Sequence, residues 1–189
     1  MSASQKGGRM AALRVDSPFQ IPGGQARMNT ERHVSVERLR LKFAAAHMAT
    51  LGDELEPLHG HNYLVRCRVD GSLTADGWVI DFAALKAYVR ETCDYLDHHF
   101  LLQEHSPLLD VASDGEAWTV GFRGRSYRFP VADVRALPIE NTTAELLAEY
   151  IAERVVERLV AGGHGNISRL SVEVEEMPGQ AGGYARDLS

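Results

Sequence analysis

Two neighbouring segments of the sequence alternate between apolar and polar residues, and histidines lie on the apolar face of each. Side chains of a β-strand point to opposite faces in turn, so the alternation predicts two half-buried strands. In segment 33–47 one face holds Leu39, Leu41, Phe43, Ala45 and His47. In segment 59–70 one face holds His59, His61, Tyr63, Val65, Cys67 and Val69. The fold has to cover both apolar faces. Because Val34 and Val36 have the other parity, a bulge or bend is expected near Glu37 and Arg38.

The remaining elements are two helices, a short hairpin and a last strand. Apolar residues recur at helical spacing over 81–97, where Asp81 is placed as the N-cap. A second helix begins at "NTTAE", where Thr142 and Glu145 have the spacing of a capping box, and ends near Gly162. The segments "EAWTVGF" and "RSYRFPV" predict a hairpin that packs on its own subunit, and "RLSVEVEEMP" predicts the last strand. This order indicates an α+β fold, an antiparallel sheet with two helices on one face.

The length of 189 residues and the 44% hydrophobic content are enough for one domain, expected over 32–189 after a flexible arm at 1–31. The formal net charge of −6 argues against a nucleic-acid partner, which requires a basic surface. No apolar run approaches the roughly 20 residues of a membrane span, and the first 31 residues lack the core of a signal peptide. Both cysteines, Cys67 and Cys93, lie in apolar patterns, so we expect core thiols and a cytoplasmic protein.

His47, His59 and His61 lie on the apolar faces of two strands that we expect to be neighbours. Residues two apart on a strand point to the same side, so the rings of His59 and His61 can converge. Zinc prefers neutral imidazole nitrogen, and catalytic zinc sites use three protein ligands and keep an open position. The pattern therefore predicts a tri-histidine zinc site. A group of packed or solvated histidines is the alternative.

Glu176 has the parity of the apolar residues of the last strand, whereas Glu173 and Glu175 lie on the other face. A carboxylate at the end of an apolar face requires a partner. We interpret Glu176 as the anchor of a ligand with an amidine-like pair of donors, which a carboxylate binds in a bidentate manner. A frayed strand end at which Glu176 reaches water is the alternative.

Asp97 and His98, in "LDHHF", directly follow the first helix. An adjacent carboxylate and imidazole can form a proton-transfer pair, because the carboxylate raises the basicity of the imidazole. The alternative is a polar helix terminus at which histidine interacts favourably with the helix dipole.

Together, "FAAAH", "HGHNY", "WVIDFAALK", "LDHHFLL", "NTTAELLAEYI" and "EEMPGQAGGY" resemble the family of 6-pyruvoyl- and 6-carboxy-tetrahydropterin synthases from about His33 to Tyr184. The resemblance implies the tunnelling fold, with two helices and a four-stranded sheet per subunit. It also implies a homo-oligomer, usually a hexamer, with active sites between subunits, and 7,8-dihydroneopterin triphosphate as the usual substrate. By motif position it implies zinc ligation by His47, His59 and His61, a proton relay of Asp97 and His98, and a pterin anchor at Glu176. Thr143, in the "NTTAE" motif, is a candidate substrate contact.

The sequence departs from the family pattern most clearly at the catalytic cysteine. That residue lies four or six positions before the first histidine of "HGH", where this chain has Leu55 and Asp53. Asp53, Glu54 and Glu56 are the nearest carboxylates, and we favour Glu54 or Glu56 as the replacement base because of their longer side chains. The stretch from Gln103 to Pro138 is also longer than the family pattern, and it carries the predicted hairpin.

The resemblance implies a zinc-dependent lyase of pterin, folate or queuosine biosynthesis. Such an enzyme acts by triphosphate elimination or by side-chain cleavage, and the missing thiol favours cleavage or a slow elimination. The alternative is a non-catalytic pterin-binding or regulatory protein that retains the metal and the anchor. A retained Asp97–His98 pair favours an enzyme, because a binding protein does not require a proton relay.

Overall fold

The computed structural model describes residues 31–37 and 40–188. Its main element is a seven-stranded sheet with the order β10-β6-β2-β5-β11-β12, and β1 also pairs with β5. The strands are β1 (Arg32–Val36), β2 (Lys42–His47), β5 (His59–Gly71), β6 (His99–Gln103), β10 (Val134–Leu137), β11 (Ile167–Met177) and β12 (Gln180–Asp187). The expected arm lies outside the described residues except for Glu31.

The strands β1 and β2 both pair antiparallel with β5, one after the other along the same strand. Val36 is opposite Cys67, and Lys42 is opposite Leu64. This break between two strands accounts for the change of parity in the sequence. Of the predicted bend, Arg38 lies outside the described residues. Arg40, just beyond it, has a φ of 77°, a left-handed conformation that turns the chain before β2 begins.

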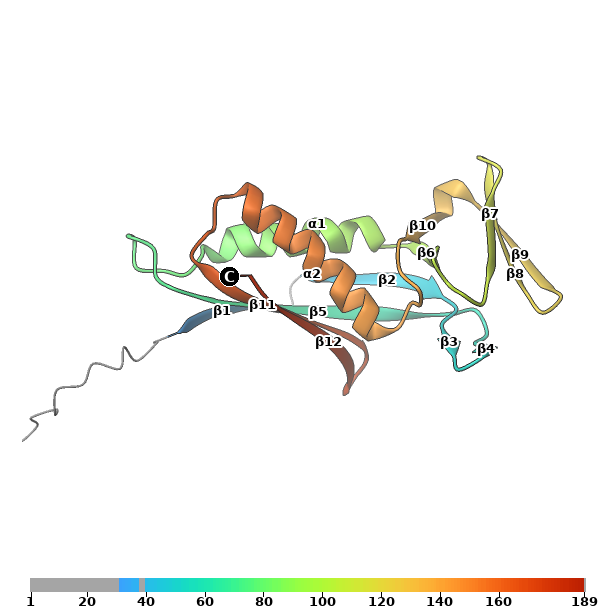
Figure 1. Ribbon diagram of the computed structural model, residues 1–189, viewed down its shortest axis with the longest axis horizontal. Coiled ribbons are helices and arrows are strands. Elements are labelled where there is room, and N and C mark those ends of the chain that lie inside the picture. Colours follow the sequence, from blue (N-terminus) through green and yellow to red (C-terminus); the bar gives the residue numbers. More distant parts are fainter. Residues whose placement is uncertain (1–30, 38–39, 189) are drawn as a thin grey trace, which may run out of the picture.

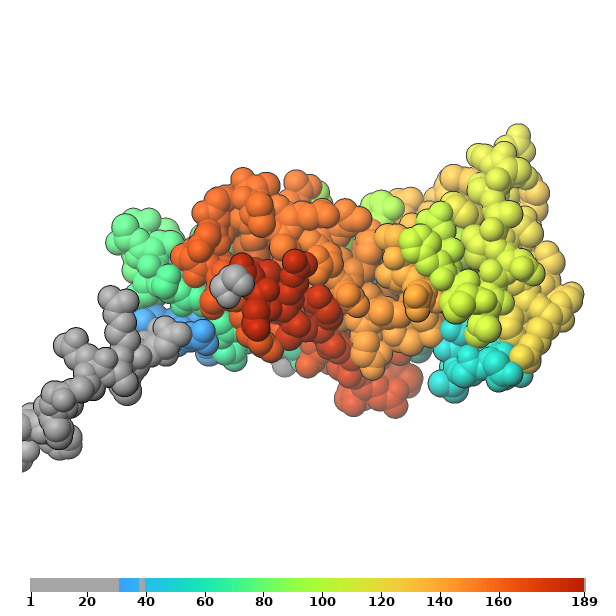
Figure 2. All heavy atoms as spheres, viewed as in Figure 1, coloured from blue at the N-terminus to red at the C-terminus, as the bar shows by residue number. Residues whose placement is uncertain are grey.

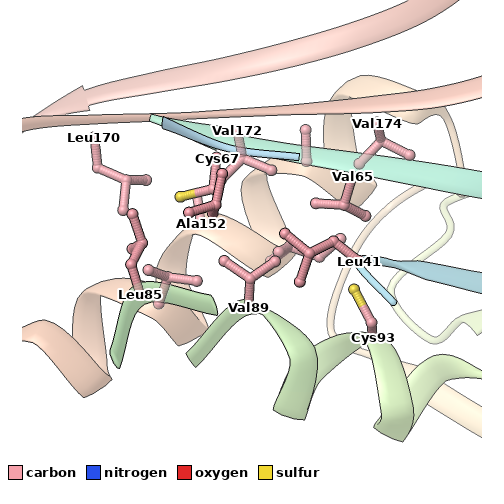
Figure 3. Packing of buried hydrophobic residues seen from close by; sticks show 14 of the residues in the cluster. Leu41, Val65, Cys67, Leu85, Val89, Cys93, Ala152, Leu170, Val172 and Val174 are labelled. Atoms are coloured by element: carbon pink, nitrogen blue, oxygen red, sulfur yellow. The ribbon is translucent and has the colours of Figure 1, made fainter. Parts of the chain in front are cut away.

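The two helices, α1 (Phe82–Leu96) and α2 (Ala144–Ala161), lie on the same face of the sheet (Figure 1). Figure 3 shows the contact between these layers, formed by Val65, Cys67, Leu170, Val172 and Val174 of the sheet, Leu85, Val89 and Cys93 of α1, and Ala152 of α2. Alternate residues of β5 and β11 enter this core, as the sequence pattern predicts. The α+β fold class is confirmed.

The predicted N-cap is correct for α1 and wrong for α2. Asp81 is the N-cap of α1, as predicted, and its carboxylate accepts from the N–H groups of Ala83 at 3.2 Å and Ala84 at 3.3 Å. The predicted capping box at Thr142 is wrong by one residue. Thr143 is the N-cap of α2 and accepts from the Leu146 N–H at 3.4 Å, so the position expected to hold glutamate holds leucine.

The sheet extends beyond the four antiparallel strands β2, β5, β11 and β12. The short strand β6 pairs parallel with both β2 and β10, immediately after α1 ends. The strands β6 and β10 are not predictable from the sequence pattern, because short apolar runs do not distinguish strand from helix. The strand β12 is not predictable either, because its residues Gly182 and Gly183 weaken the strand signal.

A second, smaller sheet stands at the end of the main sheet where the histidines lie (Figure 1). It consists of β7 (Asp110–Ser113), β8 (Ala117–Phe122) and β9 (Arg125–Pro130), with β8 and β9 forming the predicted hairpin. A short 3₁₀ helix, η1 (Val131–Asp133), leads from it to β10. We call β7–β9 the small sheet. A separate two-stranded hairpin, β3 (Thr50–Leu51) and β4 (Glu54–Leu55), lies beside it.

The small sheet has its own apolar cluster, which confirms that it packs on its own subunit. The cluster contains Val120 and Phe122 of β8 together with Met48, Leu55, Phe100, Leu102, Leu109 and Val134. In the described part of the chain, no helix is long and apolar enough to cross a membrane.

Candidate active site

The three histidines meet where β2 ends and β5 begins. In the antiparallel register His47 is opposite His59, and Ala45 is opposite His61. All three side chains lie on the face of the sheet that the helices cover, and one ring nitrogen from each lies within 4.8 Å of the others. The structure therefore brings together the three histidines that the sequence singled out.

Hydrogen bonds to carbonyl groups fix the protonation of two of these rings. Nδ1 of His47 lies 3.0 Å from the carbonyl oxygen of Thr142, and Nδ1 of His59 lies 2.8 Å from that of Pro57. A carbonyl oxygen only accepts, so each Nδ1 carries the proton and each Nε2 presents a lone pair.

These two lone pairs face one another across 3.2 Å, the distance between Nε2 of His47 and Nε2 of His59. Two acceptors at this distance repel unless a cation lies between them. Ligand nitrogens of a tetrahedral zinc ion are roughly 3.3 Å apart, which follows from Zn–N bonds of about 2.0–2.1 Å. The donor set and the spacing of His47 and His59 therefore fit a metal ion, which His47, His59 and His61 could hold together.

Buried polar groups hold His47 in this orientation. The Thr142 hydroxyl also lies 3.2 Å from its Nδ1 and donates to Oε1 of Gln103 at 3.3 Å. Gln103 in turn donates to the carbonyl oxygen of Met48 at 2.8 Å. Burial and the neighbouring His59 lower the pKa of His47 to about 4, despite its hydrogen bond to Thr142, so the ring is neutral near pH 7. Such outer contacts orient metal ligands.

Gly60 lets the two strands approach closely between the histidines. A Cβ atom at this position would lie 2.8 Å from the carbonyl oxygen of Ala45 on β2. A side chain here would therefore push β2 away from β5 and separate His47 from His59.

A cavity of about 570 Å³ opens over the histidines. Its lining includes His47, His59, His61, Glu56, Thr143 and Glu176. The hydroxyl of Thr143 accepts one hydrogen bond in the cap of α2, so it retains its O–H donor and one lone pair at the wall of the cavity. Thus the three histidines, the carboxylates of Glu56, Glu145 and Glu176, and a threonine surround one space.

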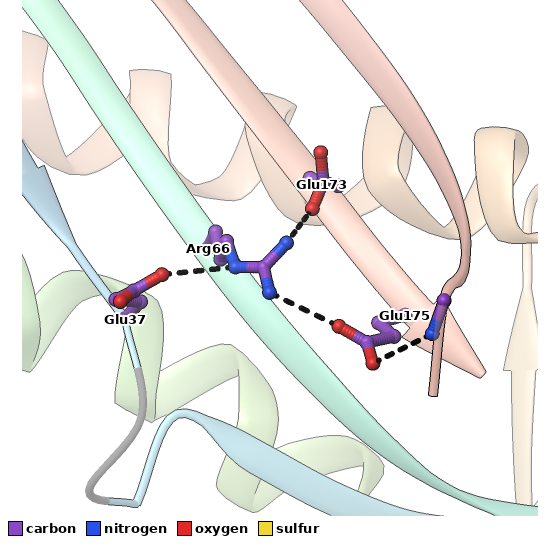
Figure 4. A network of polar contacts seen from close by, with 5 residues as sticks. Glu37, Arg66, Glu173 and Glu175 are labelled. Carbon is purple, nitrogen blue, oxygen red and sulfur yellow. Dashed lines mark hydrogen bonds and ion pairs between the residues drawn. The ribbon is translucent and has the colours of Figure 1, made fainter. Parts of the chain in front are cut away.

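Glu176 and Glu175 point in opposite directions, as the strand parity predicts. Glu175 accepts from Arg66 at 3.1 Å on the other face of the sheet, and Arg66 also contacts Glu37 and Glu173 (Figure 4). Glu176 instead lines the histidine cavity. Burial raises the pKa of its carboxyl above the usual range, and His61 opposes this shift while Glu56 reinforces it.

The structure separates the two candidate bases from one another. Glu54 accepts from Arg123 of the small sheet at 2.7 Å, and Asp53 accepts from the same guanidinium at 2.9 Å. Hydrogen bonding to Arg123 lowers the pKa of Asp53. Glu56 alone of the three carboxylates lines the cavity. Leu55, at the position of the family's cysteine, is buried in the cluster of the small sheet.

Both cysteines of the chain are free and buried in the core. Burial is the largest cause that raises the pKa of each thiol, to about 12 for Cys67 and about 12 for Cys93. A thiol with such a pKa stays protonated near neutral pH, so neither cysteine supplies a thiolate.

Asp97 and His98 form a pair, but they do not line the histidine cavity. Oδ2 of Asp97 lies 2.8 Å from Nδ1 of His98, and Oδ1 accepts from the Ala44 N–H at 2.7 Å. Although burial opposes ionisation, these hydrogen bonds hold the pKa of the Asp97 carboxyl below its usual range. The pair opens instead into a neighbouring cavity of about 900 Å³, which shares His61 and Glu176 with the first.

His98 has a strained backbone. Its φ is 59°, in the left-handed region that residues other than glycine rarely adopt, and its N–H donates to the carbonyl oxygen of Ala44 at 2.6 Å. Its side chain is 82% exposed. This contact with β2 fixes the backbone of His98, and the imidazole projects from the surface of its own subunit.

A cluster of three histidines that could hold a metal ion, and that opens into a cavity with acidic groups, has the arrangement of mononuclear metal sites that keep an open position. A family model described as 6-pyruvoyl tetrahydropterin synthase matches residues 37–187. The chain belongs to this family.

Relatives and solved structures agree with this assignment. A protein of Methanocaldococcus jannaschii, provisionally named a 6-carboxy-5,6,7,8-tetrahydropterin synthase, is 34% identical over 149 residues, which cover 78% of this chain and 91% of the relative. The structure of Plasmodium falciparum 6-pyruvoyl tetrahydropterin synthase has a TM-score of 0.79 at 32% identity, covering 85% of this chain and 100% of that one.

A second similar structure comes from another Plasmodium species. It is a variant of Plasmodium vivax 6-pyruvoyltetrahydropterin synthase in which a glutamate, described as a catalytic residue, is replaced by alanine. It has a TM-score of 0.79 and 30% identity, covering 85% of this chain and 100% of that one.

Several residues that orient the site residues were not predicted from the sequence. Thr142 and Gln103 orient His47, and Arg123 binds Glu54. Asn141 binds both the N–H and the carbonyl of Thr50. These contacts join segments far apart in the chain, and strand or helix periodicity carries no signal for them. The adjacent threonines of "NTTAE" were the one available hint, since only one of two can cap the helix.

Replacing His59 by alanine should remove the metal while the subunit stays folded, because this ring lies at the exposed start of β5 and not in the core. We expect about one zinc per chain in the unmodified protein. The measurement is metal analysis after gel filtration, with His105→Ala as the control variant. Full metal occupancy in the His59→Ala protein would rule out the tri-histidine site.

Proposed function

We propose that the protein is a zinc-dependent lyase that cleaves the side chain of 7,8-dihydroneopterin or its triphosphate, with Glu56 as the base. The observation that carries this proposal is the position of Glu56 in the cavity of the three histidines, while the family's cysteine position is occupied by the buried Leu55.

His47, His59 and His61 would hold zinc, which prefers imidazole nitrogen and would supply Lewis-acid activation and orientation of the substrate hydroxyls. Glu176 holds the pterin ring. Its carboxylate matches the 2-amino group and the adjacent ring N–H, a pair of donors that binds in a bidentate manner. Holding the ring there orients the side chain toward the histidines and Glu56.

Glu56 takes the proton of the C2′ hydroxyl. The C2′–O bond becomes a carbonyl as the C1′–C2′ bond breaks, and its electron pair passes into the ring imine at C6–N5. A proton then returns to C1′. The products are a 6-hydroxymethyl dihydropterin and a two-carbon aldehyde, which carries the phosphates when the substrate is the triphosphate. The catalytic glutamate of the Plasmodium vivax relative supports a carboxylate in this role.

A 6-carboxy product is a second candidate, and the name of the Methanocaldococcus jannaschii relative favours it. Both reactions require a base at Glu56 and an anchor at Glu176. Mass spectrometry of the products formed from 7,8-dihydroneopterin and from its triphosphate separates them. An absence of any product, together with tight pterin binding, would support the non-catalytic alternative.

We also propose that Asp97 and His98 serve the active site of a neighbouring subunit in a homo-oligomer, a hexamer by the family pattern. The pair opens into a different cavity from Glu56, and the exposed His98 is held outward by β2. In this arrangement the pair exchanges protons with the substrate from the side opposite Glu56.

Replacing Glu56 by glutamine should lower kcat by about 10²–10⁴-fold, the usual effect of removing a positioned base. Glu54→Gln is the matched control, because it lies two residues away but is paired with Arg123 outside the cavity. Steady-state assays on 7,8-dihydroneopterin and its triphosphate give the comparison. Equal losses in the two variants would be inconsistent with a specific role of Glu56.

Replacing Glu176 by glutamine should weaken the binding of 7,8-dihydroneopterin at least tenfold, since a charge-assisted pair contributes on the order of 1.5–3 kcal/mol. The control is Glu173→Gln, which lies on the same strand but contacts Arg66 on the other face.

The same interaction should depend on pH. The pKa of Glu176 is raised, so its charge is lost as pH falls through a value above the usual range of a glutamate, about 4.3. Calorimetry should show affinity declining on that acidic side in the unmodified protein, and a flatter profile in Glu176→Gln.

Mixed oligomers test the role of Asp97 and His98. Glu56→Gln and His98→Ala should each be nearly inactive alone. If the pair acts in the neighbouring site, random mixing of the two variants forms about a quarter of the sites with both groups intact, and activity returns. If the pair acts in its own subunit, every site carries one defect, and the mixture stays as inactive as its components.

A further inference from the structure

We propose that the small sheet, β7–β9, positions Glu56 in the active site, with Arg125 and Phe122 as the positioning residues. The inference rests on the proposed role of Glu56 and concerns what holds that side chain in place. Figure 2 shows the surface of the small sheet against the β3–β4 hairpin at one end of the molecule.

Leu55 connects Glu56 to the small sheet. Its side chain is only 4% exposed and belongs to the same apolar cluster as Phe122 and Val120 of β8. Its carbonyl oxygen accepts from Arg125 of β9 at 3.3 Å. Both the side chain and the backbone of the residue before Glu56 are therefore held by the small sheet.

Arg123 and Arg125 reinforce this contact. Their guanidinium carbons lie 5.1 Å and 5.0 Å from the centre of the Phe122 ring, at cation–π distance. Arg123 also binds the carboxylates of Asp53 and Glu54. The two acidic groups nearest to Glu56 in the sequence are thereby turned toward the small sheet and away from the histidines.

The other side of the hairpin is anchored to the main body. The N–H of Glu56 donates to the carbonyl oxygen of Ala49 at 3.0 Å, and Asn141 binds both backbone groups of Thr50. Between these two anchors, the side chain of Leu55 lies in the apolar cluster of the small sheet, and the side chain of Glu56 lines the cavity of the histidines. A shift of this segment by one residue would place Leu55 or Pro57 at the cavity instead.

A double-mutant cycle between the small sheet and Glu56 tests this inference. Arg125→Ala should lower kcat about 10- to 100-fold, the range expected when a catalytic group moves by about an ångström. KM and the metal content should stay unchanged, and Arg125→Lys should recover part of the loss. Arg128→Ala is the control, because Arg128 lies on the same strand but pairs with Asp114 at 3.0 Å, away from the hairpin.

The decisive comparison is made in the Glu56→Gln background. If Arg125 acts through Glu56, adding Arg125→Ala to Glu56→Gln should change kcat less than twofold. A variant that only lowers the folded fraction would reduce kcat by the same factor in both backgrounds. That result would overturn the proposal. Phe122→Leu provides an independent second cycle if Arg125→Ala does not fold.

The pH profile of kcat is a further readout. If the activity of Glu56→Gln is below detection, the pH profile of kcat for Arg125→Ala decides: a displaced Glu56 shifts the profile, whereas a profile only scaled down contradicts the proposal. Full activity of the Glu56→Gln single variant would instead refute the proposed function. This failure differs from a failure of the positioning proposal, because it appears in a protein whose small sheet is unchanged.

Discussion

The antiparallel register between β2 and β5 is the constraint on which the site depends. It places His47 opposite His59 and leaves His61 one rung further along the same face. Because side chains alternate along a strand, a slip of one residue would move an entire set of histidines to the other face of the sheet. The apolar residues that follow in both strands hold the register, since the same slip would expose them. The packing of the core and the meeting of the three histidines therefore require the same alignment.

The groups around the histidines divide the remaining tasks between different parts of the chain. Thr142, which directly precedes the N-cap of α2, and Gln103, at the end of β6, fix the ring of His47. The end of β11 supplies Glu176, and the small sheet holds the segment that carries Glu56. These elements lie far apart along the chain, so the site forms only when the whole fold has formed.

Periodicity predicted the parts of the site that lie on regular strands. The three histidines and the opposite orientations of Glu175 and Glu176 followed from parity alone, because the period of a strand is fixed. The distinction between Glu54 and Glu56 did not, because it depends on a guanidinium of Arg123 from a distant hairpin. The capping of α2 was placed one residue early, since two adjacent threonines are equivalent until one of them is used by His47.

The burial of both thiols has a consequence for the conditions under which the protein can work. A catalytic thiolate is lost when oxidants convert it to sulfenic and higher acids, and it is blocked by alkylating reagents. Cys67 and Cys93 are enclosed in the core and stay protonated. A carboxylate at Glu56 is not oxidised in this way, and it is a much weaker nucleophile than a thiolate toward alkylating reagents. An activity that depends on this site would therefore persist under oxidative stress that inactivates a cysteine-dependent enzyme.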